Sequence, residues 1–487
     1  MAYKEYSIGK PTYNVEPQAK VLQVDAAKDC YFENTGEGYY AIRRRPGFSL
    51  FLDPLSGEGG TTHTGQGIFW SDRFNAAFAV VNGRLIKIMD SVGTHTEIVG
   101  TTMNATNPVV FAEGQDLATV PYIYIAHGGR LVYTDGQALI SPTDVSTPET
   151  CDYVSFANVR FFATAGGQDM FITDTNPSTG FLDIFYWSGS GNPFRSALRA
   201  DALKAVFTIW DEIALIGEKS IEYWQEDGSN PISPLIGATT EAGIIAPYSL
   251  KRCENTLYFL SDIGEKRAVV KLSDRSPLII SDAIDRVLQE MTTVSDAIAS
   301  LVFVGGLNLY VLHFPTEGVT WAYDFKDEIW TEWGQYDSVS SSYLPFPIVG
   351  SCYAKPWNKH LFLSTDGKVY AFDRNTYQDA GTSMRTMIRT GWLYHGTAKR
   401  KRANALYLKV KAYSPTAGSL LLRWRDDGRP EWSPYIELPV GKESQEQYYN
   451  VLNRCGIYRS RQYEFLMTDN TDLALMGIAE DLTELRN

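Results

Sequence analysis

Apolar residues alternate with polar ones in short runs over most of the chain, a pattern that indicates strands rather than helices. The recurring unit is a β-hairpin: an alternating strand, a short turn with Gly, Asn or Asp, and a second strand rich in aromatic and β-branched residues. Seven stretches fit this unit, and they begin at Ala76, Tyr122, Arg160, Glu212, Thr256, Asn308 and His360. Such self-similarity predicts a repeat architecture.

The spacing of these hairpins favours a β-propeller. Their second strands follow one another at intervals of about 40 to 52 residues, within the range of propeller blades. Apolar segments around the hairpins, such as those from Ala202 and Glu328, bring each unit to four strands. Stacking such sheets around an axis buries both faces and leaves only short edges. The sequence therefore predicts an all-β, seven-bladed β-propeller, and the alternative is an open meander or a pair of β-sandwiches.

The two ends of the chain depart from this repeat. After about Thr386 the strands become longer and alternate cleanly, which favours an additional C-terminal β-sandwich-like domain over residues 386–487. The stretch EGYYAIRRRPGFSLFLD reads as an extra strand pair that would complete the last blade and close the ring. We expect an N-terminal arm over 1–36 and a propeller over 37–385, and the sandwich domain is the expected partner of the N-terminal segment. A short helix is predicted over Ser281–Met291, with Ser at the N-cap position.

Composition adds that the chain is acidic. Its formal net charge of -13 repels nucleic-acid phosphate, so sequence-specific DNA binding is not expected. Five widely separated cysteines without a C-x-x-C pair predict reduced thiols in a protein made in a cytoplasm. The start, MAYKEYSIGKPTYNVEP, has no apolar h-region, and no later run approaches the roughly 20 apolar residues that span a bilayer, so we expect neither a secretion signal nor a membrane span.

The search for chemistry finds no motif of a catalytic, metal or cofactor site. No P-loop, nucleophile elbow or H-E-x-x-H motif occurs, and the six histidines have no metal-ligand spacing. We therefore expect no enzyme activity, no catalytic or metal residue and no cofactor. Two basic runs remain as candidate ring-interface or partner contacts, namely Arg43, Arg44 and Arg45, and Lys399, Arg400, Lys401 and Arg402. The alternative for the second run is a solvated loop.

One segment resembles a known structural turn. WRDDGRPEWS, from Trp424 to Ser433, is similar to the Asp-box turn of sialidase-type propellers. In those proteins the Asp accepts backbone hydrogen bonds and the Trp packs beneath the turn. The resemblance implies a structural turn that contains Asp426, Asp427, Gly428 and Trp432.

Two longer stretches together resemble one protein family. They are EGYYAIRRRPGFSLF near the start and WRDDGRPEWSPYIELPVG with YRSRQYEFLMTDNTDLALMGIAEDL near the end. The segment GEKSIEYWQEDGSNPISP, from Gly217, is also similar to a blade strand of this family. The family is the tail nozzle, tail hub or packaged DNA stabilisation proteins of short-tailed bacteriophages. Its frequent Gly-Gly-x-Thr-Trp is replaced here by Asp427 to Trp432, which keeps the turn but leaves a partner contact there open.

The resemblance implies a structural virion protein that is assembled in the host cytoplasm. Six copies would form a homo-hexameric ring below the portal and the adaptor (head-to-tail connector) protein, retain the packaged genome and provide the channel for DNA ejection. The implied partners are the adaptor, a needle or tip protein, tail fibres or spikes, and double-stranded DNA in transient passage. An acidic lining would keep DNA mobile, because each phosphate that Lys or Arg neutralises adds affinity. The alternatives are a carbohydrate-active or a host-surface-binding β-propeller.

Overall fold

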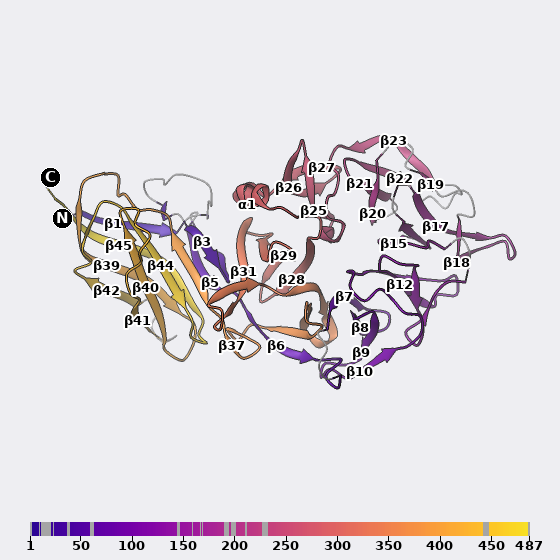
Figure 1. Ribbon diagram of the computed structural model, residues 1–487, viewed down its shortest axis with the longest axis horizontal. Coiled ribbons are helices and arrows are strands. Elements are labelled where there is room, and N and C mark those ends of the chain that lie inside the picture. Colours follow the sequence, from indigo (N-terminus) through magenta and orange to yellow (C-terminus); the bar gives the residue numbers. More distant parts are fainter. Residues whose placement is uncertain are drawn as a thin grey trace.

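Two regions built almost entirely of strands make up the protein (Figure 1). One is a propeller, and the other is a layered domain near which both ends of the chain lie (Figure 1). The computed structural model describes residues 2–8, 10, 21–22, 24–36, 39–58, 63–143, 147–157, 159–165, 167, 169–188, 194–195, 201–209, 212–225, 232–441 and 448–485.

Six blades of the propeller are each formed by four consecutive strands within the described ranges. The first three blades contain β7 (Gly65–Ser71), β8 (Ala76–Val81), β9 (Arg84–Ile88) and β10 (His95–Ile98); β11 (Val110–Gln115), β12 (Pro121–Ala126), β13 (Val132–Thr134) and β14 (Leu139–Ile140); and β15 (Tyr153–Ala157), β16 (Arg160–Thr164), β17 (Asp169–Asn176) and β18 (Phe181–Ser188), with β19 (Phe194–Arg195) beside β17. The next three contain β20 (Leu203–Ile209), β21 (Glu212–Gly217), β22 (Ile221–Gln225) and β23 (Ser233–Thr240); β24 (Lys251–Cys253), β25 (Thr256–Ile263), β26 (Lys266–Ser273) and β27 (Ser276–Ile279); and β28 (Ile298–Val304), β29 (Leu307–Phe314), β30 (Val319–Asp324) and β31 (Ile329–Asp337).

The seventh predicted unit is not a blade of four consecutive strands. It contains β33 (Ile348–Ala354), β34 (Lys359–Ser364) and β35 (Val369–Asp373), and its fourth strand is β6 (Gly47–Leu52) from the N-terminal side, which pairs antiparallel with β35. Between β35 and Thr386 the chain forms only β36 (Gln378–Asp379) and β37 (Thr382–Ser383), both too short to complete a blade. The described residues thus form six self-contained blades rather than the seven predicted, and one composite sheet. The prediction that an N-terminal strand closes this last sheet is confirmed.

Strand β8 shows why the sheets stack around an axis. All of its residues are buried, and alternate side chains reach the cores on opposite faces of the blade. Phe78 packs with Ile123 of the next blade, whereas Ala79 lies in the cluster that contains Leu361 of the composite sheet. Because both faces are covered, this middle strand is a continuous apolar run rather than an alternating one.

The second region, which we call the terminal domain, is formed by the described residues of the ranges 2–44 and 386–485. One of its sheets contains β1 (Ala2–Ile8), β2 (Val21–Leu22), β4 (Cys30–Gly36), β5 (Tyr39–Arg44), β39 (Lys401–Ala412), β42 (Tyr448–Asn453), β43 (Ile457–Tyr458) and β45 (Leu473–Glu484). The other continues from β31, which also pairs with β32 (Ser342–Pro345), and contains β3 (Val24–Lys28), β38 (Thr386–Thr390), β44 (Arg461–Met467), β40 (Gly418–Asp426) and β41 (Ile436–Val440). Leu406 of the first sheet and Phe465 of the second belong to one buried cluster, so the two sheets enclose a common core.

The N-terminal residues that the structure describes are strands of the terminal domain and not a separate arm. Strand β1 pairs antiparallel with β45, and β3 pairs antiparallel with β38. Strand β5 also belongs to this domain, so the boundary expected at residue 37 lies instead between Arg44 and Gly47. Strands β5 and β6, which were predicted as a pair, therefore belong to different domains.

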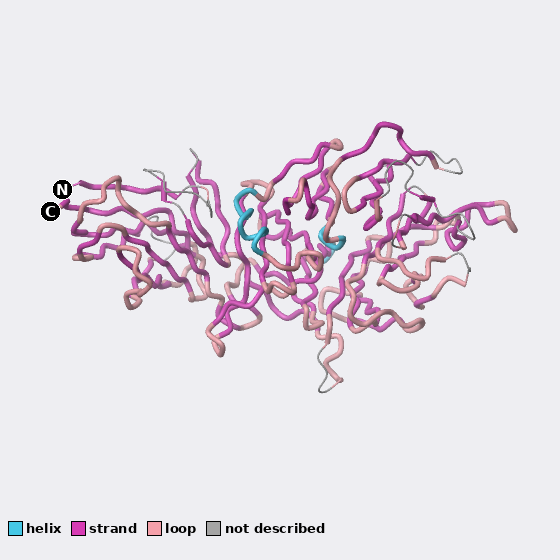
Figure 2. The backbone as a smooth tube through the Cα atoms, turned by 45° about the horizontal axis from the view of Figure 1, so that its top comes forward, coloured by secondary structure: helices cyan, strands magenta, loops and turns pink. Residues whose placement is uncertain are grey.

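Helical segments are short in the part of the chain that the structure describes (Figure 2). The predicted helix between blades is confirmed as a 3-10 turn, Asp282–Ile284, followed by α1 (Asp285–Glu290). The hydroxyl of Ser281 does not cap it, but accepts a hydrogen bond of 2.9 Å from the backbone N–H of Val269. Two further 3-10 turns span Pro247–Ser249 and Lys355–Trp357.

Candidate axial and partner-contact sites

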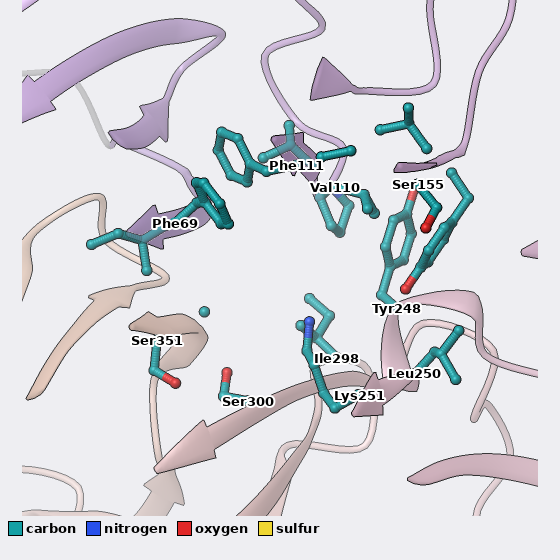
Figure 3. A pocket seen from close by; sticks show the side chains of 18 of the residues that line it. Phe69, Val110, Phe111, Ser155, Tyr248, Leu250, Lys251, Ile298, Ser300 and Ser351 are labelled. Carbon is teal, nitrogen blue, oxygen red and sulfur yellow. The ribbon is translucent and has the colours of Figure 1, made fainter. Parts of the chain in front are cut away.

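A cavity of about 390 Å³, which we call the axial cavity, lies where the first strands of the sheets converge (Figure 3). Its lining comes from β7, β11, β15, β20, β24, β28 and β33, so every sheet of the propeller contributes. The volume lies within the range of small-molecule sites, about 300–1,000 Å³. It is far too small for a DNA duplex, whose major groove alone is about 12 Å wide.

Lys251 of β24 extends its amine into the axial cavity (Figure 3). No hydrogen bond or ion pair joins this amine to another residue of the described ranges. The side chain keeps some exposed surface because the cavity is open, but burial lowers the pKa of the amine to about 8. The propeller axis therefore contains an ammonium group without a carboxylate partner.

The other polar groups around the axial cavity are mostly engaged. Ser351 donates a hydrogen bond of 2.6 Å to the carbonyl of Leu301, and the carboxylate of Glu113 accepts one from Ser71. The hydroxyl of Ser300 differs, because the residue is only 2% exposed and its oxygen has no hydrogen-bond partner in the described protein. Lys251 and Ser300 thus present unsatisfied polar groups to the same space.

Arg45, from the first basic run, joins three parts of the chain. Its Nε donates to Asp29 in the terminal domain at 2.7 Å, and its Nη atoms donate to both carboxylate oxygens of Asp379 in β36 at 2.9 and 2.7 Å. A further bond of 2.9 Å reaches the carbonyl of Gly334 in β31. Burial raises the pKa of Asp29 to about 6, and the charge of Arg45 opposes this shift. We call this set the Arg45 junction.

Arg43 and Arg44 also make contacts within the chain. Arg44 is buried and donates to the carbonyls of Met384 at 2.8 Å and Thr471 at 3.2 Å, and burial lowers its pKa to about 10. The side chain of Arg43 is 13% exposed and forms ion pairs with Glu33 and Asp472. A surface-contact role is therefore not open to Arg44 and Arg45, because the run lies at the domain crossing and satisfies its buried carbonyls and carboxylates.

The second basic run is divided between surface and interior. Lys401 is only 1% exposed, and its amine donates to the carbonyls of Tyr394, Thr397 and Lys399 at 3.0, 2.8 and 3.1 Å. Burial lowers the pKa of this amine. Lys399, Arg400 and Arg402 are exposed, at the end of the terminal domain where the chain also ends. The predicted contact surface is thus reduced to these three cations, because Lys401 closes the loop that precedes β39.

Three of the four residues predicted for the Asp-box-like turn lie in the turn itself, and the fourth, Trp432, lies outside it. Asp427 accepts backbone hydrogen bonds from Arg459 and Ser460 at 2.7 and 3.0 Å, and Asp426 forms an ion pair of 2.7 Å with the buried Arg461. Gly428 takes the left-handed conformation, with a φ of 71°, that a side chain would disfavour. Trp432 lies farther along, on one face of the sheet that contains β40.

Around Trp432 lies a cluster that the sequence analysis missed, the arginine face, formed by Arg389, Arg423, Arg425, Trp432 and Glu464. The three guanidinium carbons lie 5.2, 4.8 and 4.7 Å from the indole centroid, and Glu464 forms ion pairs with Arg389 and Arg423. Hydrogen bonds from Arg389 and Tyr435 lower the pKa of Glu464 although burial acts to raise it. The alternation Arg423-Trp424-Arg425 in a predicted strand was the available signal, since it places both arginines on the face opposite the core.

Within the described ranges no group of three or more His, Cys, Asp or Glu side chains is arranged to hold a metal ion. Among the same residues, no helix has the length and apolar character that crossing a membrane requires.

The sequence also matches a known protein family. The family model described as bacteriophage P22 Gp10, β-propeller, matches residues 35–377. The chain belongs to this family of phage tail proteins. The matched range includes the axial cavity and the Arg43 to Arg45 run of this tail protein, and it ends before the terminal-domain strands that carry Lys399 to Arg402 and the arginine face.

Solved structures similar to this phage tail protein are themselves distant in sequence. The extracellular domain of a one-component system from B. thetaiotaomicron is 10% identical with a TM-score of 0.43, and the match covers 90% of this chain and 60% of that one. The N-terminal domain of Nup159 is 11% identical with a TM-score of 0.37, covering 75% of this chain and 100% of that one. YCF48 from Cyanidioschyzon merolae is 12% identical with a TM-score of 0.36, covering 67% and 98%. No curated protein matches the sequence.

Proposed function

We propose that this phage tail protein is a nozzle subunit of a short-tailed phage. Copies of it would form a ring below the portal and the adaptor, retain the packaged genome and provide the channel for DNA ejection. The observation that carries the proposal is the family match over residues 35–377, which covers all six self-contained blades. Such a subunit is assembled in the host cytoplasm and remains in the virion.

The size of the axial cavity argues against a DNA channel through a single propeller. A space of about 390 Å³ cannot admit a duplex, so DNA would pass between subunits and not through a propeller. A channel of this kind requires several copies around a common axis, which supports a ring, and we propose a homo-hexamer.

Charge supports passage of DNA without tight binding. The chain carries a formal net charge of -13, and each phosphate neutralised by Lys or Arg would add affinity that ejection must then break. We propose that the channel-facing side of the ring is net acidic and that double-stranded DNA passes without sequence-specific contacts.

The exposed cations Lys399, Arg400 and Arg402 are the proposed contacts with an acidic surface of a neighbouring copy or of the adaptor. Among the described residues, Lys399 forms a loose ion pair of 3.7 Å with Glu484, and its side chain is 61% exposed. These cations therefore remain available to a partner. A needle or tip protein and tail fibres or spikes are the other proposed partners.

Cryo-electron microscopy of the phage particle tests the ring directly. We expect six copies on the DNA axis, below the adaptor, with an acidic lining. A position away from the axis would contradict the nozzle function, and a lining dominated by Lys and Arg would contradict the proposed mode of passage.

A charge-reversal variant tests the contact surface. We expect Arg400→Glu with Arg402→Glu to weaken assembly with the purified adaptor, measured by mass photometry, because two attractive charges become repulsive. The matched control is Arg286→Glu, which reverses an exposed arginine of the propeller, with a side chain that is 75% exposed. Equal assembly of both variants would show that these cations do not contact the adaptor.

A further inference from the structure

The axial cavity combines two polar groups for which the described residues provide no partner. The amine of Lys251 ends in the open space, and the hydroxyl of Ser300 belongs to an inner strand that faces the same space (Figure 3). A buried hydroxyl without a protein partner disfavours folding, and so does an ammonium that is partly removed from water without a counter-charge. Neither group is needed to close the propeller, because the blades pack through apolar clusters. Their joint placement therefore calls for a ligand.

We propose that the axial cavity binds a small oxyanion, which the Lys251 ammonium and the Ser300 hydroxyl hold together. A phosphate, sulfate or small carboxylate supplies a negative charge to Lys251 and an acceptor to Ser300. The cavity of about 390 Å³ is large enough for such an ion with some of its water. This binding function is independent of the proposed ring.

The other charged groups of the lining leave Lys251 as the recognition element. Glu113 accepts a hydrogen bond from Ser71, and burial raises the pKa of its carboxyl. Arg252 donates through its Nε to the carbonyl of Glu254 at 2.7 Å. The lining thus contains two cationic side chains and one carboxylate, which favours an anion over a metal cation. Neutral polar ligands would leave the charge of Lys251 uncompensated.

Calorimetric titration of the full chain with inorganic phosphate tests the proposal, and acetate replaces phosphate in a parallel arm at the same ionic strength. We expect saturable binding to the wild-type chain and at least tenfold weaker binding to Lys251→Met, since the charge is lost while the length of the side chain is kept. Ser300→Ala should weaken binding severalfold. Tighter binding of phosphate would indicate a phosphate-type ligand, and tighter binding of acetate a carboxylate.

Lys271→Met is the matched control, because Lys271 lies on β26 of the same blade and does not line the cavity. It should bind phosphate as the wild type does. Acetylation of Lys251 in the wild-type chain, followed by mass spectrometry, gives a second readout that needs no variant, and phosphate should slow it severalfold. Absence of saturable binding to the wild type, equal binding by Lys251→Met, or acetylation that phosphate does not change would each overturn the proposal.

Discussion

The propeller and the terminal domain differ in how their buried histidines are paired. In the propeller, His313 and His360 are 2% and 4% exposed, and burial lowers the pKa of each to about 4, so both are neutral near pH 7. In the terminal domain, the ring of His395 lies 2.8 Å from the carboxylate of Glu480 with both side chains fully buried. Burial acts to raise the pKa of Glu480, but interactions with its neighbours, first of all the hydrogen bond with His395, outweigh burial and lower the pKa.

This difference follows from how the two regions are assembled. Each blade folds from consecutive strands and buries apolar faces against its neighbours, and buried charge can be paired locally, as in the Arg160–Asp174 ion pair within one blade. The terminal domain instead brings together described strands from the two ends of the sequence, such as β1 and β45. Strands so far apart in sequence have many alternative registers, and ion pairs with fixed geometry select one of them. We infer that the buried charges of the terminal domain and the Arg45 junction provide this specificity.

Removal of Arg45 should have the largest effect on stability and on the coupling between the propeller and the terminal domain. Arg45→Met leaves Asp29 and Asp379 buried without their counter-charge, and we expect a loss of about 3–5 kcal/mol in the free energy of unfolding. The two regions should also uncouple, so that a single thermal transition divides into two. Differential scanning calorimetry measures both effects.

The control for this variant is Arg286→Met, which removes an exposed ion pair with Glu290. We expect no measurable change in stability, because exposed pairs of this kind contribute little. If Arg45→Met melted in one transition at the wild-type temperature, the junction would not couple the two regions.

Much of the propeller could be predicted from the sequence because its pairings are local. The hairpin from Ala76 shows its strands and turn within a few residues, and the other hairpins repeat this pattern at regular spacing. The number of self-contained blades was wrong because the last hairpin takes its fourth strand from Gly47–Leu52, about 320 residues earlier in the chain. The strands before residue 37 were missed for the same reason, since β1 pairs with β45 at the other end of the chain.

The candidate sites were less predictable, because burial depends on the tertiary structure. Arg43, Arg44 and Arg45 look alike in sequence, yet only the fold decides that Arg45 meets two carboxylates and Arg44 meets carbonyls. Lys401 differs from Arg402 in the same way. Nothing around Lys251 distinguishes it in the sequence, since its isolation arises from seven inner strands that meet on one axis.

Glu480→Gln should give the next largest effect, about 2 kcal/mol, because a hydrogen-bonded buried charge is replaced by a neutral amide. The carboxylate accepts hydrogen bonds from Tyr458 and Tyr463 as well as the contact with His395. Since its folded-state pKa is lowered, its contribution is present above the unfolded pKa of about 4.3 and is lost as pH falls below it. Urea denaturation at pH 7 and pH 3.5 measures this, and an unchanged difference between wild type and variant at both pH values would contradict it.

As pH is lowered, the buried histidines of the propeller should reduce stability at a higher pH than Glu480 does. Their pKa is about 4 in the folded chain and about 6.5 when unfolded. The unfolded state therefore binds more protons between these values, and stability is full above pH 6.5 and falls toward pH 4. Asp29, with a pKa raised to about 6, acts in the opposite direction. His313→Gln should reduce the slope by about 1.1 kcal/mol per pH unit between pH 5 and 6.

The exposed His95 provides the control for the histidine slope. The slope of His313→Gln is compared with that of His95→Gln, which removes an imidazole from the surface. An equal slope in the wild type and His313→Gln would show that protonation of His313 does not oppose folding.

Lys251→Met should give the smallest change and the opposite sign, a gain of about 1 kcal/mol in phosphate-free buffer at pH 7, which is less than the full pKa difference corresponds to because the amine reaches solvent through the open cavity. The folded-state pKa of Lys251 is about 8, below the unfolded value of about 10.4, so the charge disfavours folding below pH 8 and this cost disappears as pH rises through 10. Saturating phosphate should raise the stability of the wild type toward that of the variant and leave the variant unchanged. Thermal unfolding with and without phosphate measures this, and a variant less stable than the wild type without phosphate would show that the propeller, like the terminal domain, depends on a buried charge.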